Sequence, residues 1–376
     1  MKKLTFFIVL TFIIQITTYS QSCLPEGIEF TTQAEIDSFQ TNHPGCAEIE
    51  GDVIIHGYDI NNFNGLNVLT SFWGRLTIYG TGNLINLKGL DNVTYIAGLF
   101  IWTGDGLNSL KGLENITSVA GDIEIICNNS LTDLTGLDNL TFVGGSLEIH
   151  HNDSIKNLSG LNNVNYIEGE LVIWDNPSLT SLTELNNLDS VGGYLAIVDN
   201  DSLTSLAGLD NVTSIGGQLQ ITQNDALTNL TGLDNINAAS INYLSITQND
   251  LLSSCEVKSV CDYLANPSGY IVISSNAPGC NTQIEVEEAC GVGIPDIILN
   301  SEFSVYPNPA EKEIYISGNN KEIIKEVNIY NQIGQKVLHE TAITNTLDIS
   351  MLKQGIYVIE MVSNERKIRK KLIIKK

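Results

Sequence analysis

Two glutamates are the residues of this 376-residue chain whose type and spacing come nearest to catalytic machinery. Glu124 and Glu148 lie 24 positions apart (148 − 124), and paired carboxylates perform glycoside hydrolysis. Strands stacked in a sheet would place such a pair about 5 Å apart without any catalytic purpose. Neither a shaped cleft nor an aromatic enclosure is evident around the pair. Site geometry, and not fold, decides chemistry, so the pair alone does not indicate an enzyme.

The histidines also fail to form a catalytic pattern. His56, His150 and His151 lie on or just after expected strands, while His43 and His339 are isolated. No His-Glu-x-x-His, Gly-x-Ser-x-Gly, Walker or dinucleotide-binding phrase occurs. The sequence therefore favours a non-catalytic protein, and it predicts no cofactor and no metal.

A row of aromatic residues is the better functional candidate. These residues flank the buried positions of expected strands, so their side chains would face outward, as those of His56 and Val172 would. The candidates for ligand binding are Tyr79, Phe100, Trp102, His150 and Trp174. Exposed rings beside Asp, Asn and Glu suit a sugar ring or a peptide. The alternative is that the rings only stiffen a flat sheet by packing across strands.

A repeat of 24 residues must position these side chains. Its clearest copy begins at Leu203 and ends at Asn224, and the Leu of its Gly-Leu-Asp-Asn word recurs at Leu66, Leu90, Leu113, Leu137, Leu161, Leu185, Leu209 and Leu233. A fixed period in the range of 20 to 50 residues is typical of a solenoid, in which each coil buries its apolar side chains against its neighbours. The fold class expected is mostly β, with a parallel β-solenoid of about ten 24-residue coils, short helical caps that contain Cys, and a small antiparallel β-sandwich after it.

The alternation within one coil predicts a strand. A Leu-x-Ile pair alternates with period two, as in a strand with one buried face, and ten such pairs occur between Val53/Ile55 and Ile271/Ile273. We expect the ten strands to form one parallel sheet. Glycine pairs such as Gly144-Gly145, Gly192-Gly193 and Gly216-Gly217 precede three strands, and we expect positive φ there.

One asparagine follows the strand in most coils. The set is Asn128, Asn152, Asn176, Asn200, Asn224, Asn249 and Asn276. Stacked amides that hydrogen-bond to the corner backbone would explain the column. Calcium binding by the Asn-Asp pairs is the alternative, but no Asp-x-Asp-x-Asp-Gly loop or Gly-Gly-x-Gly-x-Asp phrase supports it.

Both ends of the solenoid carry cap signals. Thr32 to Glu35 predicts a capping box that opens a helix ending near His43, and Ser253 to Glu256 predicts a second one before a helix that stops ahead of Pro267. Six cysteines bracket the repeats and are disulfide candidates: Cys23, Cys46, Cys255, Cys261, Cys280 and Cys290. Pairing of Cys23 with Cys46 is favoured, while the other four allow three connectivities or a zinc site, and Cys127 is left over.

The termini and the charge distribution indicate export. Residues 1–21 predict a signal peptide, because about 13 apolar residues are too few for a spanning helix, which needs about 20. Residues 22–300 hold 5 Lys or Arg against 34 Asp or Glu (5 − 34 = −29), whereas residues 301–376 hold 12 against 9 (12 − 9 = +3). So acidic a body is expected to repel nucleic acid and anionic lipid. No membrane-spanning segment is expected in the mature chain.

The repeats resemble a known family. The form Leu-x-x-Leu-x-Gly-Leu-x-x-Val-x-x-Ile-x-Gly-x-Leu-x-Ile-x-x-Asn, flanked by Cys, is similar to the receptor L-domain group of leucine-rich β-solenoids, from residue 23 to about 290. That resemblance implies an extracellular recognition domain. Signalling does not carry over, because neither a kinase nor a transmembrane segment accompanies the repeats.

The last 76 residues resemble a sorting domain. The words that carry the resemblance are Tyr306-Pro307-Asn308-Pro309, Asn328-Ile-Tyr-Asn-x-x-Gly334-Gln, Gly355-Ile-Tyr357 and a basic last strand. In this order they are similar to the C-terminal (type A) sorting domain of the type IX secretion system, which implies recognition by the outer-membrane translocon. A carbohydrate-binding or fibronectin-like sandwich is the alternative, since it shares the architecture but not the words.

These expectations combine into one functional hypothesis. The predicted domains are a signal peptide (1–21), a capped solenoid (22–290), a linker (291–300) and a sorting domain (301–376). The hypothesis is a secreted, outer-membrane surface-attached or extracellular protein for recognition or adhesion, with the translocon and a glycan or extracellular protein as partners and no nucleic acid. A structural coat protein is the alternative, and a carbohydrate-active enzyme is a distant third.

Overall fold

The computed structural model describes residues 21–102, 106–292, 303–318, 324–341, 346–362 and 367–376. The predicted signal peptide lies almost wholly outside the described residues. Among those that are described, no helix is long and apolar enough to cross a membrane. The chain is mostly β, as the alternating pattern predicts.

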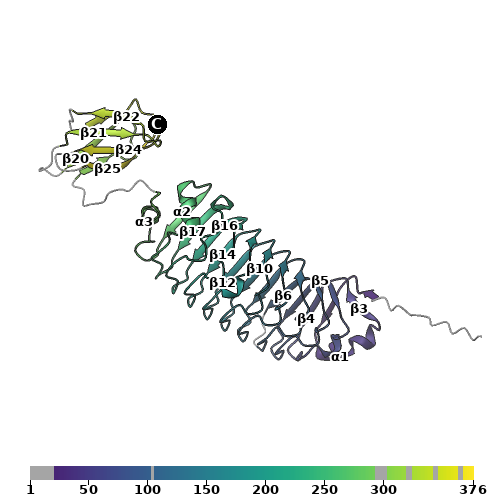
Figure 1. The fold of residues 1–376 in the computed structure, drawn as a ribbon. Helices are drawn as coiled ribbons and strands as arrows, with labels where there is room; N and C mark the ends of the chain where they lie inside the picture. Colours follow the sequence, from purple (N-terminus) through teal and green to yellow (C-terminus); the bar gives the residue numbers. More distant parts are fainter. Residues whose placement is uncertain (1–20, 103–105, 293–302, 319–323, 342–345, 363–366) are drawn as a thin grey trace, which may run out of the picture.

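The ten Leu-x-Ile pairs lie side by side in one row of parallel strands (Figure 1). Leu147 pairs with Ile123 on one side and with Leu171 on the other, and the same register continues along the row. This confirms the predicted sheet. The strands are β4 (Val53–His56), β5 (Ser71–Tyr79), β6 (Tyr95–Trp102), β8 (Ile123–Ile126), β10 (Leu147–His150), β12 (Leu171–Trp174), β14 (Leu195–Val198), β16 (Gly217–Thr222), β17 (Ile241–Thr247) and β18 (Tyr270–Ser274).

In most coils a short strand comes before the strand of the main row along the chain, and these short strands form a second parallel row. The long strands β5 and β6 run through both rows, so that together they form an 18-stranded sheet. The remaining strands of this sheet are β1 (Gln21–Cys23), β2 (Ile28–Phe30), β3 (Cys46–Ile49), β7 (Ser118–Val119), β9 (Phe142–Val143), β11 (Tyr166–Ile167), β13 (Ser190–Val191) and β15 (Ser214–Ile215). Three coils also contain a single 3₁₀ turn, η1 (Asn64–Leu66), η2 (Thr183–Leu185) and η3 (Ala238–Ser240).

The apolar columns of the repeat form one continuous core. In the coil that begins at Leu203, the side chains of Leu206, Leu209, Val212 and Leu219 are fully buried. Each such side chain contributes roughly 1.5–3 kcal/mol of transfer free energy. Since every coil shares its core with the next, no coil is expected to be stable alone.

The buried asparagines form the predicted ladder. Asn176 donates from Nδ2 to the carbonyls of Trp174 (3.1 Å) and Ile149 (2.9 Å), and its Oδ1 accepts from the backbone N–H of Asn152 (3.3 Å). The same pattern recurs in the neighbouring coils. The ladder satisfies the backbone N–H of each preceding Asn and adds a second donor to corner carbonyls such as that of Trp174, which also accepts from the N–H of His151 at 3.1 Å.

A second row of asparagines was not anticipated. The Asn of each Leu-Asp-Asn or equivalent word is exposed and donates to a carbonyl one coil back, as Asn187 does to Asn162 (2.6 Å). The regular recurrence of this Asn in the sequence could have predicted the second row.

The glycine pairs before the strands have a different reason from the one expected. Neither Gly144 nor Gly192 has positive φ, and of the six glycines only Gly217 does (148°). A Cβ on Gly144 would lie 2.2 Å from the carbonyl oxygen of Ala120, and one on Gly192 would lie 2.1 Å from that of Glu168. These positions are therefore glycine because the backbone of the neighbouring coil approaches closely. Positive φ falls instead on the residue before each ladder Asn, from 52° at Asp175 to 59° at Ser275.

The N-terminal cap matches its prediction. Helix α1 (Gln33–Asn42) has Thr32 as N-cap with a complete capping box to Glu35, ends at His43, and buries Ile36 and Phe39. In Figure 1 it lies at the opposite end of the solenoid from the helices of the other cap.

The second predicted capping box is wrong. Helix α2 (Lys258–Ala265) begins after Val257, which makes no side-chain cap. Residues 252–256 still belong to the last coil, because Leu252 and Cys255 are buried in the solenoid core. Helix α3 (Gln283–Cys290) was not predicted, and its N-cap Thr282 accepts from the N–H of Glu285. The Thr-x-x-Glu spacing of that pair was the signal.

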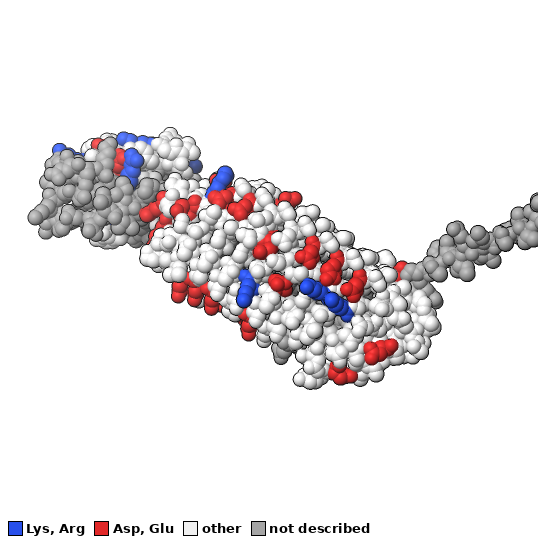
Figure 2. Space-filling model, turned by 60° about the horizontal axis from the view of Figure 1, so that its bottom comes forward, with Lys and Arg blue, Asp and Glu red and all other residues white. Residues whose placement is uncertain are grey.

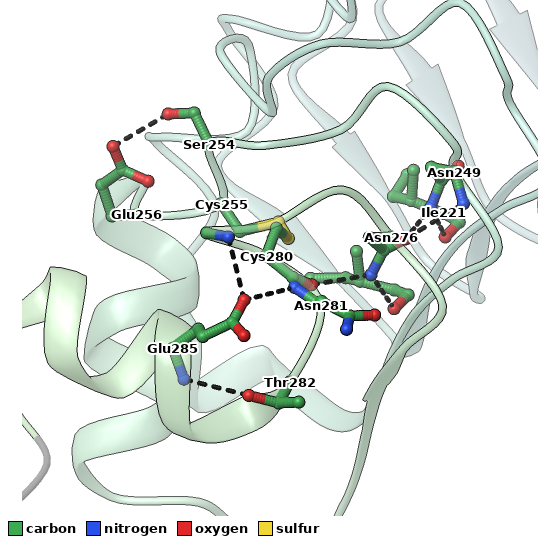
Figure 3. Close-up of a disulfide and its surroundings, with 12 residues drawn as sticks. Ile221, Asn249, Ser254, Cys255, Glu256, Asn276, Cys280, Asn281, Thr282 and Glu285 are labelled. Carbon is green, nitrogen blue, oxygen red and sulfur yellow. Dashed lines mark hydrogen bonds between the residues drawn. A yellow bond between two sulfur atoms is a disulfide. The ribbon is translucent and has the colours of Figure 1, made fainter. Parts of the chain in front are cut away.

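Three disulfides fasten the caps. Cys23 pairs with Cys46, the pairing that the sequence favours. Cys255 pairs with Cys280 (Figure 3) and Cys261 with Cys290, which selects one of the three open connectivities and removes the zinc alternative. Beside the first of these, Glu285 accepts from the backbone N–H groups of Gly279 and Asn281, both at 2.9 Å. Cys127 is free.

The C-terminal unit is a small antiparallel sandwich with its own core. One sheet consists of β19 (Phe303–Tyr306), β20 (Glu313–Gly318) and β23 (Thr346–Asp348), and the other of β21 (Glu326–Tyr330), β22 (Lys336–Glu340), β24 (Gly355–Val362) and β25 (Lys367–Ile374). Ile314 from the first sheet and Val327 and Ile359 from the second are fully buried in one cluster. This cluster is separate from the solenoid core.

Candidate functional site

The predicted aromatic residues project from the outer face of the main row of strands. Tyr79, Trp102 and Trp174 occupy the last position of β5, β6 and β12, directly after the buried pair. The exposed fractions of Trp102 and Trp174 are 45% and 39%, in contrast to the buried side chains beneath them. The period-two alternation therefore places these rings outward, as predicted.

The structure does not bring the five candidates together as one surface. Trp102 lies 6.5 Å from Tyr79 and 6.4 Å from Phe100 between ring centroids, which makes a first cluster. His150 and Trp174 form a second cluster, with centroids 5.6 Å apart. Between the two clusters, β8 presents Ile126, which is the register partner of both Trp102 and His150.

Two further rings extend these clusters. His56 stacks on Tyr79 with centroids 4.7 Å apart and an interplanar angle of 10°, and its Nε2 contacts Glu29 Oε1 at 2.7 Å. His151 packs against Trp174 at 4.6 Å and contacts the carboxylate of Asp175. His151 was not predicted at the site, because it lies one residue past the strand, where a left-handed φ of 57° turns it back toward Trp174.

The glutamate pair lies on the same face. Glu124 and Glu148 are register partners on β8 and β10, and Arg75 donates from Nη2 to Glu124 Oε1 at 2.6 Å. Burial, and then the charges of Glu124, Glu170 and Asp122, raise the pKa of Glu148 above the ordinary value of a glutamate. This is the behaviour of crowded like charges on a half-buried surface.

His150 and Tyr194 are also perturbed by burial. Burial, and next the neighbouring His151, lower the pKa of His150, whose Nδ1 is buried and has no hydrogen-bond partner among the described residues. Burial together with the Glu170 carboxylate raises the pKa of Tyr194 to about 12. His150 is therefore neutral at physiological pH, and its ring acts as an aromatic surface and not as a charge.

Acidic side chains outnumber basic ones in the solenoid, with 34 Asp or Glu against 5 Lys or Arg in residues 22–300. On the face drawn in Figure 2, Asp and Glu run along the solenoid in rows that few Lys or Arg interrupt. Among the described residues, no group of three or more His, Cys, Asp or Glu is placed to hold a metal ion.

The sorting residues lie on the C-terminal sandwich. The side-chain amide of Asn308 donates to the carbonyl of Lys371 and accepts from the N–H of Ile373, both at 2.8 Å, which ties the opening segment to β25. Tyr306 stacks on Tyr315 with centroids 5.7 Å apart. The peptide bonds preceding Pro307 and Pro309 are both cis.

The remaining sorting residues lie in a turn and in a strand of the same unit. Gly334 has a φ of 75° in the β21–β22 turn, and Gly355 begins β24. The hydroxyl of Tyr357 donates to the carbonyl of Lys353 at 2.9 Å. Between β24 and β25, the carboxylate of Glu360 is 2% exposed and accepts from Arg369 at 2.6 Å.

Two family models match the chain. Residues 304–375 match the secretion system C-terminal sorting domain, and residues 141–207 match the receptor L domain. The sorting domain marks proteins of the type IX secretion system, so the chain is exported by that route and is extracellular or attached to the cell surface. Both matched families are of non-catalytic kinds. No curated protein matches the chain.

Proposed function

We propose that the solenoid is the recognition part of a non-catalytic surface protein, which binds a glycan or an extracellular protein through the two aromatic clusters of the main sheet. The observation that carries the proposal is the exposure of Trp102 and Trp174 on a sheet whose other large apolar side chains are mostly buried. Exposed tryptophans lose water-accessible apolar surface when a ligand covers them, and this contributes to affinity.

Packing alone accounts less well for the two tryptophans than for their neighbours. His150 is 15% exposed in its side chain and lies among other rings, as a packing residue would. Trp102 and Trp174 leave more of their surface in water and occupy equivalent positions three coils apart, on β6 and β12. Stiffening of the sheet would not require that exposure.

The absence of catalysis is part of the proposal. Glu124 is engaged by Arg75, and Glu148 lies beside it on the next strand, so the two carboxylates face the same way. A glycosidase needs its two carboxylates on either side of the scissile bond. A carbohydrate-active enzyme would therefore need a different pair.

We also propose the division of labour along the chain. Residues 22–290 would act as the capped recognition body, residues 291–300 as the linker and residues 301–376 as the unit read by the translocon. The sorting signal would be formed by Tyr306, Pro307, Asn308, Pro309, Gly334, Gly355 and Tyr357. The separate hydrophobic cores of the two units support this division.

The test replaces both tryptophans in the full chain. Trp102→Ala/Trp174→Ala is expected to lower binding to a glycan and extracellular-protein array by one to two orders of magnitude, as hot-spot aromatic residues do. Tyr270→Ala is the control, because Tyr270 is 79% exposed on β18 of the same sheet but lies outside both clusters. Circular dichroism should show the same β content for all three proteins. Equal binding by the double variant and the parent would remove the aromatic clusters from consideration. Absence of any ligand, together with ordered self-assembly, would favour a coat protein.

A further inference from the structure

A hollow of about 350 Å³ opens beside the first aromatic cluster, and the proposed function does not use it. Its floor is formed by residues without bulky side chains, among them Gly74, Ala97 and Gly98. Its walls are Trp73, Arg75 and two aspartates, Asp52 and Asp122. These residues come from four neighbouring coils, so the hollow exists only in the folded solenoid.

A bulge in β5 creates the hollow. Phe72 pairs with Ile96 and Arg75 with Gly98, so β5 advances by three residues (75 − 72) where β6 advances by two (98 − 96). The extra residue disrupts the ladder locally, and bulges are known to redirect side chains in this way. Trp73 lies in the bulge and is 53% exposed.

Glycines keep the floor open. A Cβ on Gly74 would lie 2.4 Å from the backbone of Gly51, so this position can carry no side chain. Gly98 differs, because a Cβ there would only reach ordinary contact with Arg75 Cγ at 3.5 Å. Without a side chain at Gly98, Arg75 can cross β6 above Phe100, with its guanidinium carbon 4.7 Å from the ring centroid, and reach Glu124.

The walls combine an aromatic platform with acceptors and a donor. Trp73 lies 4.7 Å from Tyr95 between ring centroids, and its Nε1 donates to Glu48 Oε2 at 3.3 Å, which fixes the indole in place. Asp52 and Asp122 each accept one backbone N–H at 2.8 Å through Oδ1, from Arg75 and Ser146 respectively. Their Oδ2 atoms make no hydrogen bond with any described residue, and Arg75 Nε donates to none.

We propose that this hollow binds one ring of a neutral sugar. A ring that presents C–H groups on one face and hydroxyls around its edge would stack on Trp73, donate to the aspartates and accept from Arg75. A volume near 350 Å³ falls in the range of small-molecule sites. A cationic ligand would be attracted by the aspartates but repelled by Arg75. An acidic sugar would be repelled by both aspartates and by Glu124, and Glu124 already accepts from the guanidinium of Arg75.

This site is distinct from the two aromatic clusters, so ligand binding at the hollow can be tested separately from binding at the clusters. The chain has three tryptophans, Trp73, Trp102 and Trp174. Trp102→Phe/Trp174→Phe leaves Trp73 as the sole indole reporter while it keeps aromatic rings in both clusters. Trp73→Phe leaves the indoles of the clusters as reporters. Fluorescence titration of the two full-length proteins therefore reads the two sites independently.

The expected result is a saturable shift of Trp73 emission to shorter wavelength with short neutral oligosaccharides of hexose and N-acetylhexosamine units. Oligosaccharides of uronic acids and oligolysine are the comparison ligands, and both should give a weaker response. Trp73→Ala in the parent chain should weaken neutral-sugar binding at the hollow, measured by calorimetry, roughly three- to tenfold.

A filling variant tests the hollow itself. Ala97→Leu extends an existing side chain at the lining and should weaken the Trp73-reported affinity about tenfold or more. Ala120→Leu is the matched control. Ile96 and Val119 are register partners, and Ala97 and Ala120 are the residues that follow them. Ala120 is exposed and does not line the hollow. The control should bind like the parent.

The other outcomes overturn the proposal. If Trp73 emission does not change while the cluster tryptophans respond, the hollow is rejected and the proposed function stays intact. If none of the three responds, both the hollow and glycan binding by the clusters are rejected. An unchanged affinity in Ala97→Leu, or a stronger response to uronic acids or oligolysine than to neutral sugars, would also reject a neutral-sugar site.

Discussion

The ladder asparagines are the polar residues on which the solenoid depends most at the level of single side chains. Asn176 is buried and satisfies three backbone groups at a corner where the preceding residue, Asp175, has a left-handed φ of 52°. Left-handed backbone is unfavourable for a residue other than glycine. The amide therefore supplies the hydrogen-bond acceptor for the buried N–H of Asn152 and holds the corner that follows the left-handed residue.

Asn176→Ala should destabilise the solenoid by about 1–3 kcal/mol, because it leaves the buried N–H of Asn152 unsatisfied. Asn187→Ala is the control, since Asn187 makes a single exposed hydrogen bond that water can replace. Urea unfolding followed by tryptophan fluorescence provides the comparison. Similar losses for both variants would contradict a special role of the buried ladder.

Glu148 should reduce stability at neutral pH. Its pKa is raised in the folded state, so the unfolded chain ionises more easily, and the resulting penalty grows as pH rises above the ordinary value of 4.5 through the folded pKa. Glu148→Gln should therefore raise the unfolding free energy at pH 7 by about 0.2–1 kcal/mol, the size of a like-charge pair across strands. Below pH 4.5 the advantage should vanish.

Urea denaturation at several pH values measures this difference. Glu168→Gln serves as the control, because Glu168 is an exposed glutamate near the same strands. A gain for Glu148→Gln that persists under acidic conditions would show that packing, and not charge repulsion, is responsible.

At the level of elements, α3 has fewer buried residues than the other two α-helices described in the solenoid, α1 and α2. Val286 is its single buried residue, and the Cys261–Cys290 disulfide joins its last residue to α2. The Thr282 cap and the Glu285 carboxylate organise its first turn. Covalent linkage therefore substitutes for a hydrophobic face.

Cys261→Ala/Cys290→Ala should loosen α3 without unfolding the coils. The disulfide closes a loop with a sequence separation of 29 residues, for which the chain-entropy estimate is roughly 3–4 kcal/mol. Hydrogen exchange should accelerate in residues 283–290 and stay unchanged in β10 and β12. Cys127→Ser controls for the loss of a sulfur. Equal protection of α3 in the double variant would mean that its non-covalent contacts suffice.

At the scale of the whole molecule, the chain joins a strongly acidic solenoid to a basic sorting sandwich. The charge balance is −29 in residues 22–300 and +3 in residues 301–376, so most of the positive charges lie in the unit that matches the sorting domain. The two cores share no residue.

Removal of residues 301–376 should stop the chain inside the outer membrane, while the solenoid itself folds with the same disulfides. Immunoblots of cell-surface, medium and cell fractions measure this distribution, with the full-length chain as the control. A truncated protein that still reaches the surface would contradict the role proposed for this unit.

The architecture of the solenoid follows from the residue pattern alone. A strict period of apolar positions specifies which face of each strand is buried, and a slip of one residue would move every side chain to the wrong face. For that reason the parallel register, the Asn ladder and the α1 capping box were all predictable from residues such as Leu147, Asn176 and Glu35. The sorting motifs likewise made the C-terminal unit predictable, because they are specific to the family whose model matches residues 304–375.

The tertiary structure alone decided the features that depend on contacts between coils. It selected Cys255–Cys280 and Cys261–Cys290, moved the start of α2 past the last coil, divided the aromatic row at Ile126 and opened the hollow beside Trp73. A repeating pattern describes what all coils share, whereas these features arise from single departures from it, such as the bulge opposite Gly98. The consequence of a departure depends on residues some 24 positions away, and only the stacked coils bring those residues together.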